Sequence, residues 1–218
     1  MNTSRKCNRL LILFFLFIGV MIFARILYSG SIRYLFLGWN IFLAWVPVVV
    51  SGYLDQFRFK EKYKQAILFF TWLLFFPNAL YIVTDLIHLQ QSTNVPLWYD
   101  ALLLFASSFI GLIMAFISLQ RVEIFLQNIF STRIVVLLTS VILFLGSFGV
   151  YLGRFQRWNS WNVVNDPLAL GMDIFSMIFS PIDNVKTWAI TFILTALYSL
   201  LYFFIKHIPL IFKTTYSQ

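Results

Sequence analysis

The sequence predicts an all-α fold: a polytopic membrane helix bundle with about six transmembrane helices and a short interfacial or re-entrant helix after the fifth. Of its 218 residues, 61% are hydrophobic and only 11% are charged, whereas soluble domains carry about 25% charged residues. Several apolar runs reach the length of about 20 residues that a membrane-spanning helix needs. We therefore expect a single integral membrane domain over residues 1–218, with the lipid bilayer as its partner.

The first three predicted spans cover about residues 10–28, 34–54 and 66–84. The first follows a basic head and resembles a secretory signal, but it is long and lacks a small-residue cleavage site, so we expect it to stay uncleaved. Arg25 lies at its far end, where we expect the side chain to snorkel to the interface. In the second span we expect Asn40 to hydrogen-bond to a neighbouring helix.

The last three predicted spans cover about residues 98–119, 134–153 and 185–205. The fourth carries small residues at four-residue spacing, which is typical of close helix packing; they are Ser107, Gly111 and Ala115. Between the fifth and sixth spans, Asp166 and Pro167 match an N-cap and a first helical residue. The helix that they begin, to about Ser180, is too short to span a bilayer.

The distribution of Lys and Arg predicts the orientation of the spans. With six spans, the two termini and the loops at residues 58–64 and 121–133 lie on one side, which carries eleven of the sixteen cations. The positive-inside rule places this side, with both termini, in the cytoplasm. The net charge of +8 is thereby explained by topology and predicts no nucleic-acid partner.

A polar stretch ends the third span on the predicted outer face. In FFPNALYIVTDLIHL, residues 75–89, a helix would align Asn78, Tyr81, Asp85 and His88 in one stripe, which lipid cannot satisfy. The short connector that follows lets Asp100, at the start of the fourth span, lie close to Asp85.

Two interpretations of these acidic residues remain open. Asp85, His88 and Asp100, together with Asp166, suit a divalent metal ion as cofactor, with Asp85 or His88 as a catalytic ligand or general base. Alternatively, Asp85 and Asp100 form ion pairs with Arg154 and Arg157 and only connect loops to helix ends.

A second polar stretch, LGRFQRWNSWNVVNDP, follows the fifth span on the same face. Arg154 and Arg157 lie on the predicted outer face, where the positive-inside rule leads us to expect few cations. The indoles of Trp158 and Trp161 favour the depth of the lipid headgroups. These residues predict capture of a lipid phosphate or an anionic envelope polymer; ordinary interfacial anchoring is the alternative. The polar residues Asn159, Ser160, Asn162 and Asn165 either cap the loop backbone or bind a sugar. In the first stretch, Asn78 and Tyr81 are further candidates for binding the substrate.

Several motifs of this chain resemble a known family. PNALYIVTDLIHL, WYD, LGRFQRWNSWN and WNIFLAWVP are similar to those of a bacterial multi-pass membrane family defined as a domain of unknown function, DUF1361. The resemblance covers nearly all of the chain and implies the fold and a localisation in the bacterial plasma membrane. The family more often has an acidic residue where this chain has Asn162.

The sequence therefore favours an outward-facing polar pocket, formed by both stretches, that binds an anionic or lipid-linked envelope substrate. Whether the protein is an enzyme is left open. The alternatives are a non-enzymatic assembly or partner protein with a structural Asp/Arg rim, and a transporter. The oligomeric state is not predicted.

Overall fold

Six helices of this chain are long and apolar enough to cross a membrane, as the sequence predicts. The computed structural model describes residues 3–54, 62–89 and 94–215, and every regular element in these ranges is helical. The candidate spans are residues 9–29, 36–53, 62–88, 97–127, 132–155 and 185–208. A shorter apolar helix follows the fifth span, which confirms the predicted architecture of a multi-pass membrane protein.

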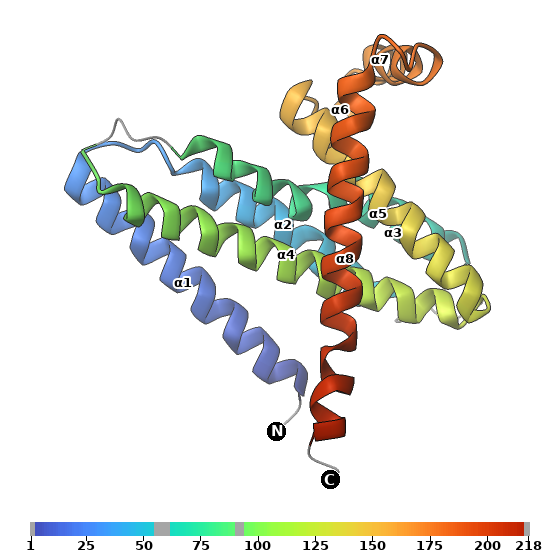
Figure 1. Cartoon of the computed structure of the whole chain (residues 1–218), viewed down its shortest axis with the longest axis horizontal. Helices are drawn as coiled ribbons and strands as arrows, with labels where there is room; N and C mark the ends of the chain where they lie inside the picture. Colours follow the sequence, from blue (N-terminus) through green and yellow to red (C-terminus); the bar gives the residue numbers. More distant parts are fainter. Residues whose placement is uncertain (1–2, 55–61, 90–93, 216–218) are drawn as a thin grey trace. The chain divides into compact units, whose positions relative to one another are not determined.

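The chain divides into two compact units, residues 1–122 and 123–218, and each is described by itself. In order along the chain, the helices are α1 (Thr3–Ser29), α2 (Phe36–Tyr53), α3 (Lys62–Tyr81), the 3-10 helix η3 (Ile82–His88), α4 (Leu97–Gln127), α5 (Thr132–Phe155), α6 (Asn162–Asn165), α7 (Pro167–Phe179) and α8 (Val185–Thr215). Figure 1 labels the α-helices.

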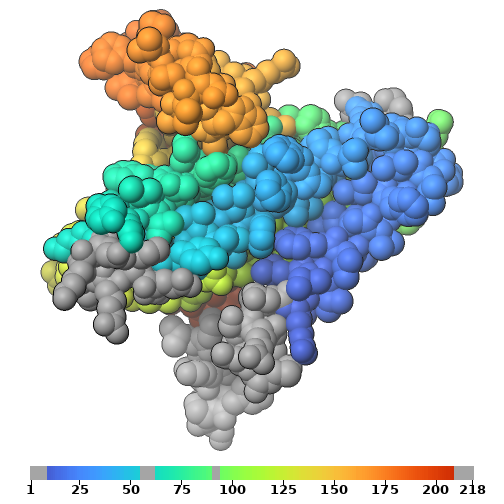
Figure 2. Space-filling view, turned by 180° about the vertical axis from the view of Figure 1, so that it is seen from behind, coloured from blue at the N-terminus to red at the C-terminus, as the bar shows by residue number. Residues whose placement is uncertain are grey.

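Unit 1 is built from α1, α2, α3, η3 and most of α4. The helices α2 and α3 pack along each other, and α1, α2 and α3 lie next to one another on the face seen in Figure 2. The predicted small-residue face of α4 packs against α3, because a Cβ on Gly111 would lie 3.0 Å from the carbonyl oxygen of Ala79. Ser108 also donates a hydrogen bond to the Ile82 carbonyl at 3.1 Å.

Unit 2 is centred on the packing of α5 against α8. Trp188 of α8 stacks nearly parallel to Phe148 of α5, with ring centroids 5.7 Å apart. The short helix α7 buries Leu170 and Met177 against Tyr151 and Leu152 at the end of α5. Aromatic and aliphatic packing therefore holds the two long helices and the short one together.

One predicted boundary was wrong, and it concerns two charged residues. The sequence predicts Arg121 and Glu123 in a loop at residues 121–133, but α4 continues through both to Gln127. No glycine or proline interrupts the helix after Gly111, and each charge finds a partner inside the protein. Arg121 donates to the Val48 carbonyl at 2.7 Å, and Glu123 accepts from Tyr202 and Lys206 within unit 2.

Candidate functional site

The polar stretch at the end of α3 changes its helix type within the predicted stripe. The α-helix ends at Tyr81 and continues as the 3-10 helix η3, in which residues three apart are eclipsed. Asn78 donates to the Phe75 carbonyl of its own helix at 3.0 Å. The regular α-helical spacing from which the alignment of all four side chains was predicted therefore ends at Tyr81, and their common face stays a prediction.

Asp85 is fully buried and faces α2. Its Oδ2 accepts a hydrogen bond from Asn40 Nδ2 at 2.8 Å, and its exposed fraction is 0%. The prediction that Asn40 hydrogen-bonds to a neighbouring helix is confirmed. A carboxylate that is buried and bonded in this way ties η3 to α2.

Asp100 is also fully buried, and its partner is Arg25 of α1. Arg25 Nε lies 2.7 Å from Asp100 Oδ1, and Nη2 lies 3.1 Å from Oδ2. Arg25 is only 2% exposed, so the prediction that it snorkels to the interface was wrong. The predicted pairing of Asp100 with Arg154 or Arg157 was wrong as well. The bidentate geometry satisfies both charges where lipid could satisfy neither.

Tyr34 connects this ion pair to η3. The Arg25 guanidinium carbon lies 4.3 Å from the centroid of the Tyr34 ring, and the Tyr34 hydroxyl donates to the His88 carbonyl at 2.9 Å. Burial and the nearby Asp100 charge raise the Tyr34 pKa above its usual value, which keeps the hydroxyl protonated as a donor. One donor of Arg25, Nη1, is buried without an acceptor.

The metal site expected from the sequence is not assembled in the described part of the chain. Among residues 3–54, 62–89 and 94–215, no group of three or more His, Cys, Asp or Glu side chains could hold a metal ion. Asp166 instead caps α7, where its Oδ1 accepts from the Ala169 backbone N–H at 3.3 Å. This confirms the predicted N-cap, while metal ligation and the catalytic roles of Asp85 and His88 stay predictions.

The second polar stretch forms a basic and aromatic end of unit 2. Arg154 lies in the last turn of α5, and Lys186, near the start of α8, places its ammonium 5.2 Å from the centroid of the Phe155 ring. Arg157 is exposed and adopts a left-handed backbone conformation with φ of 62°. We call Arg154, Phe155, Arg157, Trp158, Trp161 and Lys186 the basic aromatic end.

The acidic and amide groups near this end serve the loop itself. Trp158 donates its indole N–H to Asp173 Oδ2 of α7 at 2.9 Å. The Asn159 backbone N–H donates to Asn162 Oδ1 at 2.7 Å, so Asn162 caps the loop, as one of the two interpretations of these asparagines has it. Lys186 was not singled out in the sequence, because only the packing of α8 on α5 brings it beside Phe155.

The predicted single pocket would join Asp85, His88 and Asp100 of unit 1 to Arg154 and Arg157 of unit 2. Each set lies at the end of its own unit that the cation distribution predicts to face outward. The single pocket stays a prediction.

Comparison with known proteins identifies a family and no activity. A family model described as "Protein of unknown function (DUF1361)" matches residues 39–201, which include both polar stretches. Searches of the curated proteins and of the solved structures gave no match.

Proposed function

This chain belongs to the family described as "Protein of unknown function (DUF1361)", and we propose that it binds an anionic, phosphate-bearing or lipid-linked envelope molecule at the basic aromatic end. One observation carries the proposal: Arg154 of α5, Arg157 of the loop that follows it and Lys186 of α8 belong to this end, and two of these three cations have no carboxylate partner among the described residues. Within the described residues, neither Arg157 nor Lys186 forms an ion pair.

The backbone at Arg157 supports a functional role for this side chain. The left-handed conformation costs a non-glycine residue about 1–2 kcal/mol, and glycine is the usual residue at such a helix end. Trp158 donates its backbone N–H to the Leu152 carbonyl at 3.1 Å, which holds the turn closed. An unpaired arginine at a strained position is typical of a ligand-binding site.

The surroundings of the basic aromatic end suit a ligand with an apolar anchor. Helix α7 is too short to cross a bilayer and exposes an apolar stripe with the spacing of one helical face: Leu168, Met172, Phe175 and Phe179. Trp161 is 40% exposed, and indoles favour the depth of lipid headgroups. A phosphate bound by the guanidinium fork of Arg157 would then keep its hydrocarbon part in the bilayer beside α7.

Replacing Arg157 with glycine separates binding from folding. The full-length protein in detergent micelles is titrated calorimetrically with farnesyl phosphate, and with farnesol as a ligand of the same chain without the charge. We expect Arg157→Gly to weaken binding of farnesyl phosphate about tenfold, the value of one charge-assisted hydrogen bond. The same variant should unfold at a temperature about 2–4 °C higher, because glycine relieves the backbone strain.

The matched control is Arg133→Gln, which removes one exposed cation at the other end of α5 and should leave both properties unchanged. Equal affinity for farnesol and farnesyl phosphate would contradict the proposal. So would unchanged binding in a properly folded Arg157→Gly protein.

A second candidate function is a non-enzymatic membrane assembly or partner protein. The observation that favours it is the full burial of Asp85 and Asp100 against Asn40 and Arg25. Groups arranged in this way hold α1, α2, η3 and α4 together. This candidate predicts that farnesyl phosphate does not bind, and that substitutions at Asp100 act on stability alone.

A further inference from the structure

We propose a second ligand site, at the other end of α4 from the Arg25–Asp100 pair: an anionic phospholipid binds in a groove of unit 1, with its phosphate on Arg121 and one acyl chain between α1 and α2. Arg121 follows Asp100 by twenty-one residues on one helix, which is about 32 Å at 1.5 Å per residue. The proposal concerns unit 1 and does not depend on the basic aromatic end of unit 2.

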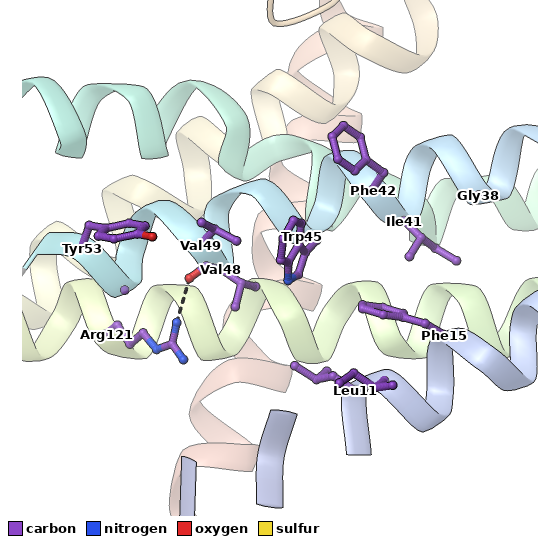
Figure 3. A pocket seen from close by; sticks show the side chains of 12 residues that line it. Leu11, Phe15, Gly38, Ile41, Phe42, Trp45, Val48, Val49, Tyr53 and Arg121 are labelled. Atoms are coloured by element: carbon purple, nitrogen blue, oxygen red, sulfur yellow. Dashed lines mark hydrogen bonds between the residues drawn. The ribbon is translucent and has the colours of Figure 1, made fainter. Parts of the chain in front are cut away.

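The groove is apolar along its length and has one charged residue. Its volume is about 690 Å³, within the range of roughly 300–1,000 Å³ that is usual for small-molecule sites. Apolar side chains from α1 and α2 line most of it; among them are Leu11, Phe15, Ile41, Phe42 and Trp45. Figure 3 shows Phe15 and Ile41 toward one end, and Tyr53 with Arg121 at the other.

The length of the groove matches an acyl chain rather than a compact ligand. On α2 the lining residues extend from Gly38 to Tyr53, which is about 22 Å of helix at 1.5 Å per residue. One leaflet of a bilayer contributes about 15 Å of hydrocarbon. Because the lining parts of α1 and α2 belong to the candidate membrane spans, lipid chains are the medium that reaches the groove.

Arg121 supplies the selectivity for an anion. One guanidinium nitrogen, Nη1, donates to the Val48 carbonyl at 2.7 Å, which fixes the side chain at the end of the groove (Figure 3). Among the described residues no carboxylate pairs with Arg121. The remaining donors of the guanidinium can therefore bind a phosphate, and the Tyr53 hydroxyl is a second polar group at that end.

The predicted orientation of the chain is consistent with this ligand. Arg121 lies on the side that the cation distribution predicts to be cytoplasmic, where anionic lipids give a membrane its negative surface potential. A lipid without net charge would bring no net counter-charge to Arg121 at the membrane boundary. The chemistry of the groove thus favours an anionic phospholipid over a zwitterionic one.

The test is native mass spectrometry of the full-length protein, delipidated in detergent and then titrated with phosphatidylglycerol or with phosphatidylcholine of the same chains. We expect one phosphatidylglycerol per chain to bind about tenfold more tightly than phosphatidylcholine, the value of one charge-assisted hydrogen bond. Arg121→Gln should abolish this preference, and Arg133→Gln, the control for net charge, should keep it.

A second pair of variants tests the groove while leaving Arg121 intact. Gly38 lines the groove and Gly19 of α1 does not, and a Cβ at either position meets no atom within 4 Å. Gly38→Leu should fill the groove and lower phosphatidylglycerol binding, whereas Gly19→Leu should not change it.

Four results would overturn the proposal. Equal binding of the two lipids to the natural sequence is the first, and an unchanged preference in Arg121→Gln is the second. The third is unaltered binding of phosphatidylglycerol in Gly38→Leu. The fourth is a dimer that forms without bound lipid and dissociates in Gly38→Leu, because the groove would then hold a second copy of the chain. Arg157→Gly should leave the Arg121-dependent preference for phosphatidylglycerol unchanged, so that failure here is distinguishable from failure at the basic aromatic end.

Discussion

Replacing Asp100 with asparagine keeps the shape of the side chain and removes the charge that balances Arg25. In the native protein the two groups make hydrogen bonds of 2.7 and 3.1 Å, and their side chains are 0% and 2% exposed. Breaking a buried ion pair by removing one partner costs about 3–5 kcal/mol. Because the asparagine amide oxygen can still accept one bond from Arg25, we expect a loss at the lower end, about 3 kcal/mol.

The free energy of unfolding is measured by titrating the protein with sodium dodecyl sulfate in mixed micelles, with helix content as the signal. A double variant, Arg25→Met with Asp100→Leu, is the control for packing. Replacing a whole buried pair with apolar residues of similar size is often neutral or stabilising, so this variant should be far more stable than Asp100→Asn alone. The reasoning would be refuted if Asp100→Asn unfolds within about 0.5 kcal/mol of the natural sequence, the range of ordinary surface changes.

Two further substitutions test other parts of the fold. Gly111→Ala should destabilise the protein by about 1–3 kcal/mol, because the new methyl group would lie 3.0 Å from the Ala79 carbonyl oxygen and 3.1 Å from the Ile82 side chain. The control is Gly171→Ala, whose Cβ meets no atom within 4 Å and which should not lower thermal stability. Asp166→Ala removes the N-cap of α7, which should lower the free energy of local opening of the first turn by about 1 kcal/mol and speed its amide hydrogen exchange accordingly. Unchanged exchange would show that the cap contributes nothing.

Much of the fold follows from local features of the sequence. The length of an apolar run decides whether a helix crosses a bilayer, and this alone predicts all six spans and the shorter helix after the fifth. The N-cap at Asp166 was predictable for a similar reason, since a cap depends on the next three residues only. The close contact of Gly111 with α3 also follows from small residues at a regular spacing.

The charged residues required the tertiary structure. From the sequence, Arg25 was expected to snorkel, and residues of the second polar stretch were one set of partners expected for Asp100. In the structure, Arg25 and Asp100 pair with each other across 75 positions. The sequence places both at the same predicted membrane face, where several cations and carboxylates were possible partners. Only the packing of α1 against α4 decides which two meet.

The sequence by itself determined that this is a multi-pass helical membrane protein, because the bilayer imposes one length and one polarity on every span. Tertiary structure decided what each polar group does inside that frame. A buried charge or amide must find its partner within the protein, and the partner depends on which helices adjoin. Hence Asp85 and Asp100 bond to Asn40 and Arg25 of neighbouring helices, and we propose that Arg121 and Arg157 bind anions.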